Sequence, residues 1–128
     1  MKTRVLLSVF LLCSVLISYV QWSYTNLSQA KVRMGSTSLG TKAFFAGGDN
    51  NINFFSLVEI YDVVDGTWTY GNLSLAREFP IGVSCGSKVF FAGGVNFGTN
   101  TVYNIVDIYD TLTKQWTVEY LSAPRFSI

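Results

Sequence analysis

The chain has 128 residues, of which 49% are hydrophobic and 13% are charged, with a formal net charge of +1 and no histidine. High hydrophobicity with low charge excludes an intrinsically disordered chain, and without a basic block a nucleic-acid partner has no electrostatic support. The lack of histidine removes the commonest general base and the imidazole ligands of zinc and copper sites. No cofactor and no metal are therefore expected.

Residues 1–21 have the pattern of a secretory signal peptide. Lys2 and Arg4 precede an apolar run over 5–17, and residues 18–21 form a weak cleavage region. At about 1.5 Å per residue, the apolar run from 5 to 20 spans about 24 Å, short of a bilayer core of about 30 Å. We expect a secreted or secretory-pathway protein. The alternative is an uncleaved signal-anchor, and only then would the membrane be a partner.

The signal peptide, or leader, also determines how many cysteines the rest of the chain contains. Cys13 lies within it, which leaves Cys85 as the single thiol of the rest of the chain. A small buried side chain in a strand is expected at Cys85, and the alternative is an intermolecular disulfide.

Short strands are expected in chain order after the leader. The first is an isolated strand over 22–28. The next four cover 34–39, the apolar run that ends at Gly47-Gly48, 57–63 and 67–70, with Asp65-Gly66 as a hairpin turn. A second set covers 81–85, the run that ends at Gly93-Gly94, 105–112 and 115–119. Thr113-Lys114 makes the corresponding turn, and no helix is expected.

The two sets are copies of one another. Asn26-Leu27-Ser28 returns 46 residues later at 72–74, and residues 41–48 return at 87–94 with the same offset. Residues 58–62 return 48 residues later at 106–110, and Trp22, Trp68 and Trp116 mark three successive units. Periods of this length indicate a repeat architecture.

The four-strand unit, with Gly-Gly after its second strand, Tyr-Asp on its third and Trp on its fourth, resembles the kelch repeat. The resemblance covers 22–128 and implies an all-β fold, a fragment of a kelch-type β-propeller. It divides the chain into a strand at 22–28, blades at 29–74 and 75–122, and the start of another blade at 123–128. The structural repeat residues are Gly47, Gly48, Tyr61, Trp68, Gly93, Gly94, Tyr109 and Trp116.

The number of units predicts a partial propeller, because closure needs about four to eight blades. The resemblance implies closure by pairing of an N-terminal strand with three C-terminal strands, and 22–28 has the place of such a strand. We therefore expect a piece of a larger propeller. Self-assembly of several copies into a ring is the alternative.

Charged residues also recur with the repeat. Lys31, Arg77 and Arg125 follow each Leu-Ser pair, and we expect them to hold blades together through Glu59 and Asp107. Asp62 and Asp110 are expected to cap turns. A pair of acids for glycoside hydrolysis is the alternative.

Loops at one end of the blades are expected to bind a protein or glycan partner, since binding residues concentrate in loops on rigid scaffolds. The candidate binding residues are Asp49, Asn50, Asn51, Phe54, Asn96, Phe97, Asn100 and Tyr103. Asn26 and Asn72 begin N-glycosylation sequons.

We thus expect a binding or scaffold module with no catalytic residues. One alternative is a fragment of a secreted propeller enzyme, copper-radical oxidase-like or sugar-processing, with its catalytic residues outside this segment. Another is a non-functional gene remnant.

Overall fold

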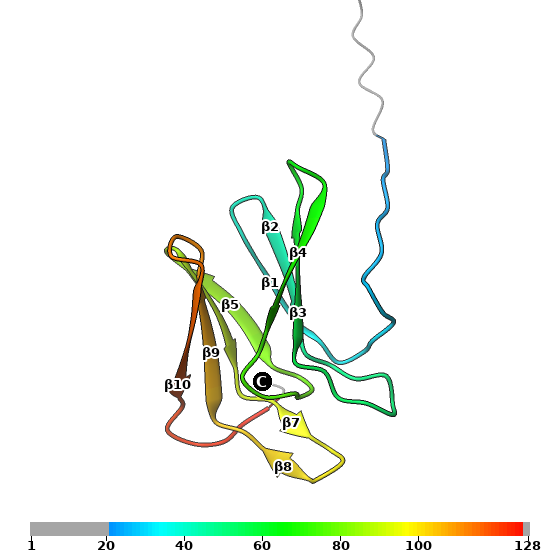
Figure 1. The fold of residues 1–128 in the computed structure, drawn as a ribbon. Coiled ribbons are helices and arrows are strands. Elements are labelled where there is room, and N and C mark those ends of the chain that lie inside the picture. The colour runs from blue at the N-terminus through cyan, green and yellow to red at the C-terminus, as the bar shows by residue number, and fades with distance from the viewer. Residues whose placement is uncertain (1–20, 127–128) are drawn as a thin grey trace, which may run out of the picture.

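The computed structural model describes residues 21–126, which form β-strands and loops without a helix (Figure 1). The proposed signal peptide, apart from Gln21, lies outside the described residues, as do residues 127–128. Within 21–126 no helical stretch has the length and hydropathy that a membrane crossing requires. The predicted all-β fold class is confirmed.

Two four-stranded antiparallel sheets make up the body of the fold. The first contains β1 (Gly35–Leu39), β2 (Lys42–Ala46), β3 (Leu57–Asp62) and β4 (Thr67–Asn72), in that spatial order. The second has the order β5-β6-β9-β10, from β5 (Ile81–Cys85), β6 (Lys88–Ala92), β9 (Ile105–Asp110) and β10 (Gln115–Tyr120). Each sheet is the up-and-down arrangement of one propeller blade.

A short hairpin interrupts the long loop of the second sheet. It pairs β7 (Val95–Asn96) with β8 (Thr101–Val102), where the sequence predicted only a loop. In Figure 1 this hairpin projects from the same end of the molecule as the loop between β2 and β3.

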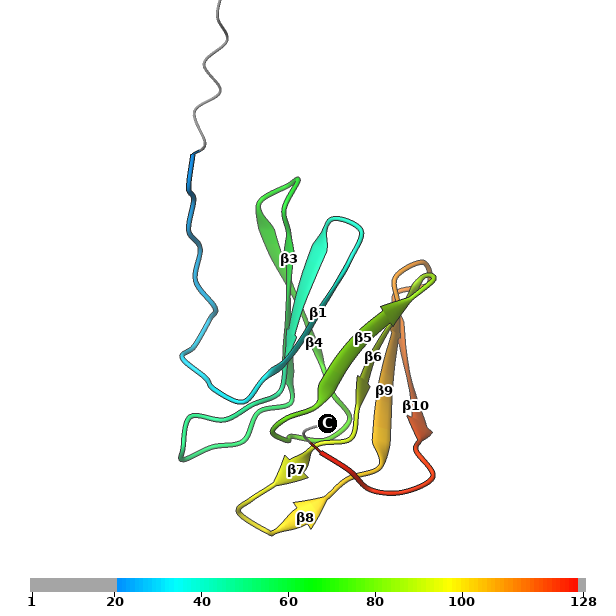
Figure 2. The same cartoon turned by 180° about the vertical axis from the view of Figure 1, so that it is seen from behind.

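The hydrophobic core lies between the two sheets, which face one another in both views (Figures 1 and 2). β1 and β5 approach most closely, since a Cβ on Gly82 would lie 2.4 Å from the carbonyl oxygen of Ser36. The alternation of side chains along each strand sends one apolar set toward the neighbouring sheet. The core residues are Phe44, Ala46, Val58, Ile60, Leu73, Val89 and Phe91.

Residues 22–28 differ from the expected strand. They form no strand and pair with no strand of either sheet in the structure. The segment still contacts the first sheet, where Thr25 Oγ1 accepts a 3.0 Å hydrogen bond from Trp68 Nε1. Thr25 therefore contacts Trp68 in the way that Gly71 contacts Trp116 in the next unit.

Cys85 differs from the expected buried thiol. It ends β5 just before the turn at Gly86, and its side chain is exposed. A strand end at the margin of the sheet has no neighbour to cover it.

Two buried ion pairs join the segment before the first strand of each sheet to the third strand of the same sheet. Lys31 Nζ lies 2.6 Å from Glu59 Oε2, and Arg77 Nη1 lies 2.8 Å from Asp107 Oδ2. The acids also accept backbone N–H bonds of 2.7 Å from Ser28 and Ser74 respectively. Burial raises the pKa of Glu59, but the donors from Lys31 and Ser28 outweigh it and leave that pKa below its ordinary value.

Arg77 makes further contacts that a lysine cannot make together. Its side chain donates to the carbonyl oxygens of Gly93 at 2.7 Å, Phe91 at 3.0 Å and Leu75 at 3.1 Å. Burial lowers the pKa of the guanidinium, and the Asp107 carboxylate opposes that shift. Arg125, the third member of the series, is exposed and donates to the Ala123 carbonyl oxygen.

We predict that Arg77→Ala lowers the free energy of unfolding by about 3–5 kcal/mol, because Asp107 then stays buried without its counter-ion. Urea denaturation followed by tryptophan fluorescence measures the change. Lys88→Ala is the matched control, since Lys88 forms an exposed pair with Asp110, and a much smaller loss is expected. Equal losses in the two variants would contradict this role for Arg77.

The carboxylates at the turns that follow β3 and β9 are expected to make an acid-sensitive contribution to stability. Asp62 accepts from Lys42 and from the Val64 N–H, and Asp110 accepts from Lys88 and from the Leu112 N–H. These contacts lower both carboxyl pKa values from 3.8 to about 2. A carboxylate whose pKa is lower in the folded state stabilises the fold fully at pH values above its unfolded-state pKa. This contribution is lost as the pH falls toward about 2.

Thermal melts between pH 5 and pH 2 test this expectation. The melting temperature should decrease as the pH falls below about 4, and Asp62→Asn should flatten that decrease. Asp65→Asn, in the same turn, is the control. An unchanged slope in Asp62→Asn would contradict the assignment.

Candidate functional site

The loop face is the end of the two sheets that carries residues 31–34, 49–55, 77–80 and 95–104. It brings together four of the eight predicted binding residues around one hollow. The hollow has a volume of about 250 Å³. Its lining residues are Arg33, Asp49, Asn51, Ile52, Phe54, Glu78 and Phe97.

The other four predicted binding residues lie outside this hollow. The Asn50 side chain accepts N–H bonds from Ile52 and Asn53, and the Asn96 side chain accepts one from Thr99, so both stabilise turns. Asn100 has a positive φ of 52° within a turn. Tyr103 is half-buried, and its backbone bonds to Gly94 and Arg125.

A charged triad forms the floor of the hollow. Arg33 donates from Nε and Nη2 to both carboxylate oxygens of Asp49, at 2.7 and 2.6 Å, and Arg33 Nε lies 2.6 Å from Glu78 Oε1. The Asp49 and Glu78 side chains are buried, whereas that of Arg33 is 33% exposed. The bond between Arg33 and Asp49 raises the pKa of the guanidinium and lowers the pKa of the carboxyl group.

The triad also fixes the loops that form the walls. Asp49 accepts the Asn51 N–H at 2.7 Å, and Arg33 Nη2 donates to Asn51 Oδ1 at 3.0 Å. Glu78 accepts the Phe97 N–H at 3.1 Å. One cation and two carboxylates therefore link both blades across the loop face.

Strained backbone surrounds the same hollow. Arg33, Asn51 and Phe79 have φ values of 57°, 68° and 50°. This left-handed conformation costs about 1–2 kcal/mol for most residues with a side chain, whereas asparagine adopts it more readily. Such conformations persist where surrounding contacts over-determine them, and they concentrate at binding sites.

The charges of the triad depart from the repeat. The 46-residue offset places Arg33 opposite Phe79, Asp49 opposite Val95, and Glu78 opposite Val32. Sequence reasoning missed Arg33 and Glu78 as site residues. A position-by-position comparison of the two copies identifies them, because at each of these positions one copy has a charged residue and the other an apolar one.

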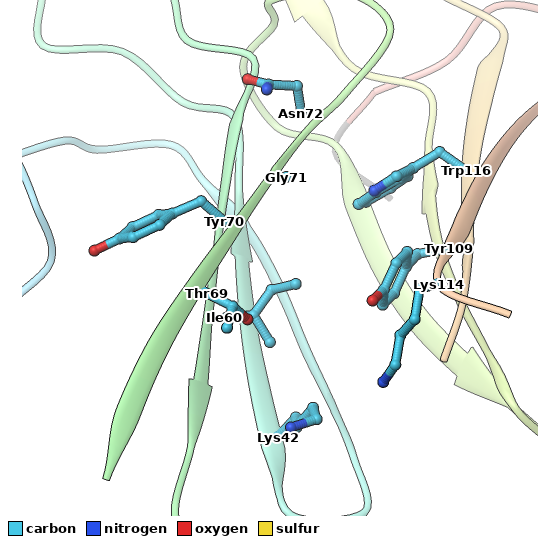
Figure 3. Close-up of a pocket in the computed structure, with 9 residues that line it drawn as sticks. All are labelled: Lys42, Ile60, Thr69, Tyr70, Gly71, Asn72, Tyr109, Lys114 and Trp116. Carbon is cyan, nitrogen blue, oxygen red and sulfur yellow. The ribbon is translucent and has the colours of Figure 1, made fainter. Parts of the chain in front are cut away.

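A second cavity, of about 590 Å³, lies between the sheets at the side of β4 and β10 (Figure 3). Trp116 and Tyr109 line one side of it and Gly71 the other, as Figure 3 shows. The rings of Tyr109 and Trp116 are in tilted contact with centroids 4.9 Å apart, as are those of Tyr61 and Trp68. These aromatics pack within and between sheets. Trp22, in contrast, is 92% exposed.

The two carboxylates considered for acid–base chemistry, Asp62 and Asp110, have structural hydrogen-bond partners. Asp62 and Asp110 bind the adjacent lysines and turn N–H groups, as described above. Residues 21–126 contain no group of three or more histidine, cysteine or acidic side chains placed to hold a metal ion.

The paired glycines mark equivalent places in the two sheets. Gly47 and Gly93 have φ values of 67° and 64°, and a Cβ on either would lie within 2.5 Å of the carbonyl oxygen of Arg77 or Arg125 respectively. Gly48 and Gly94 also have positive φ. Only glycine allows this conformation together with such close backbone contact.

Two equivalent four-stranded sheets that pack face to face, with tryptophan on each fourth strand, define successive blades of a β-propeller. The family model of the Kelch motif matches residues 30–72 and 82–119, more than half of the chain. The chain belongs to the Kelch motif family. No curated protein matches it.

We predict that Gly71→Val destabilises the contact between the blades. A Cβ at this position would lie 3.1 Å from Trp116 Cζ2 and Nε1, so a larger side chain must displace the indole, at a cost of about 1–3 kcal/mol. Thr67→Val, at an exposed place on the same strand, is the control. Urea unfolding of both variants measures the difference. Equal stability would contradict the observed packing of Trp116.

Proposed function

We propose that this chain is a kelch-repeat binding module that recognises a protein partner through the loop face. The observation that carries the proposal is the non-repeating triad of Arg33, Asp49 and Glu78, which holds a hollow open between loops of two blades. Members of the family generally mediate protein–protein interaction, and residues on loops above a rigid scaffold are the usual place for such contacts.

Apolar side chains around the hollow support a protein partner. Ile52 is 83% exposed and Phe97 is 51% exposed, although both sit beside buried charges. Phe97 also belongs to an aromatic cluster with Phe79 and Phe126, with ring centroids 5.7–6.5 Å apart. Exposed aromatics on a fixed framework are typical of the residues that contribute most to protein binding.

The proposal assigns no catalytic residue to this chain. The alternative of a propeller enzyme would need its catalytic groups elsewhere, and no contact among residues 21–126 favours it. A glycan partner remains the alternative ligand class for the same face.

Site-specific photo-crosslinking tests the proposal. A benzophenone amino acid at position 97 should capture a partner from the secretory compartment, and the same group at position 112, in the exposed turn between β9 and β10, should not. That turn lies at the opposite end of the blades from the loop face (Figure 1). The captured protein is then purified. Phe97→Ala should weaken its binding at least about tenfold, with Leu112→Ala as the control. Capture at position 112 alone would contradict the proposal.

We also propose that the protein enters the secretory pathway and is glycosylated. Residues 1–21 have the features of a signal peptide, and a membrane attachment would require that they stay uncleaved. Asn26 and Asn72 are both exposed within their sequons, which is the condition for glycan transfer on a folded surface.

Expression in a eukaryotic secretory host tests both statements. Peptide N-glycosidase should increase the electrophoretic mobility of the product, and Asn26→Gln and Asn72→Gln should each remove part of that change. N-terminal sequencing reports whether the leader is cleaved near residue 21. A product without glycan in this host would contradict the glycosylation proposal.

A further inference from the structure

We infer that the hollow at Arg33 binds an uncharged segment of the partner protein, with one apolar side chain between Phe54 and Phe97 and one backbone carbonyl oxygen on Arg33 Nη1. This inference rests on the proposed function of the loop face and adds the chemistry that the partner must present. It depends on the charge balance of the triad, the free edge of the guanidinium and the nature of the walls.

The charge balance disfavours an anionic ligand. Asp49 and Glu78 carry two negative charges against the single positive charge of Arg33, and no other charged side chain lines the hollow. An exposed arginine ordinarily attracts a carboxylate or phosphate. Here the surplus carboxylate repels such a group, because like charges brought together at an interface are unfavourable.

The free edge of Arg33 favours a neutral acceptor. A guanidinium is planar and carries five N–H donors in a fixed fork. The edge formed by Nε and Nη2 is occupied by Asp49, Glu78 and Asn51. Nη1 has no hydrogen-bond partner among the residues that the structure describes, and the planar geometry directs it away from Asp49. A carbonyl oxygen satisfies this donor without bringing charge.

The walls favour an apolar side chain over a sugar. Phe54 is half-buried against Gly98, where a Cβ would lie 2.9 Å from the ring, and Phe97 is held through the bond from its N–H to Glu78. A sugar presents several hydroxyl groups that each need a partner. The carboxylates beneath the walls are buried and already bonded, so the hollow offers few polar groups to meet them.

Solution NMR of the ¹⁵N-labelled 128-residue chain tests the inference with three small probes. N-acetyl-L-leucine N-methylamide presents a neutral carbonyl and an aliphatic side chain. N-acetyl-L-aspartate N-methylamide presents the same backbone with a negative charge, and methyl β-glucoside presents hydroxyl groups. The amide signals of Asn51 and Phe97 report binding in the hollow.

The leucine probe should shift these signals, and the aspartate probe should bind at least about tenfold more weakly, which corresponds to about 1.4 kcal/mol. Phe97→Ala should abolish the shifts caused by the leucine probe. This variant removes an exposed ring and spares the buried triad, so its fold is expected to survive, and Leu112→Ala is the matched control. Arg33→Lys should weaken the leucine probe as well, because an ammonium group lacks the outward edge of the fork.

Three results would overturn the inference: tighter binding of the aspartate probe, binding of the glucoside alone, or no shift with any probe. A failure of the proposed function can be distinguished from a failure of this inference. If the crosslinked partner depends on Phe97 while the probes leave the hollow unperturbed, the loop face binds protein without the contact inferred here. If no partner depends on Phe97 but the leucine probe binds, the hollow recognises this chemistry and the proposed partner site is wrong.

Discussion

The rest of the structure depends on a buried acid in the third strand of each sheet. Glu59 and Asp107 each accept a backbone N–H and a basic side chain from the segment that leads into the same blade. Because a buried carboxylate without a partner is costly, each acid fixes the course of that segment. Arg77 bonds to the carbonyl oxygens of Phe91 and Gly93 at β6 and pairs with Asp107 on β9, so it ties the connection between the blades to both strands. The loop face is positioned by these contacts.

The candidate site arises where the repeat is broken. Positions that contribute to packing keep their character in both copies, as Tyr61 with Trp68 and Tyr109 with Trp116 illustrate. Arg33, Asp49 and Glu78 do not, and they meet at the junction of the two blades. A repeat fold is stabilised by contacts that recur between neighbours. A cluster of charges that does not recur is therefore free to serve recognition, and it also sets the sign of the ligand that the hollow tolerates.

Much of the fold could be predicted from the sequence because apolar strands and turn residues recur in phase. The expected strand over 57–63 ends one residue earlier, at Asp62, since the turn begins where that carboxylate caps the Val64 N–H. The hairpin of β7 and β8 was missed because two-residue strands carry no periodic signal. The site was predicted only in part. Phe54 and Phe97 lie in loops that the sequence already predicted to bind a partner, whereas Arg33 and Glu78 lie in connections where charged side chains are normally solvated.

A double-mutant cycle on Arg77 and Asp107 tests the central claim most directly. Arg77→Met and Asp107→Leu are made singly and together, and the free energy of unfolding is measured for all four proteins. If the buried pair fixes the connection between the blades, each single change is strongly destabilising and the double variant recovers part of the loss, with a coupling energy of about 2 kcal/mol or more. Additive losses would show that the two residues act independently and would contradict the account.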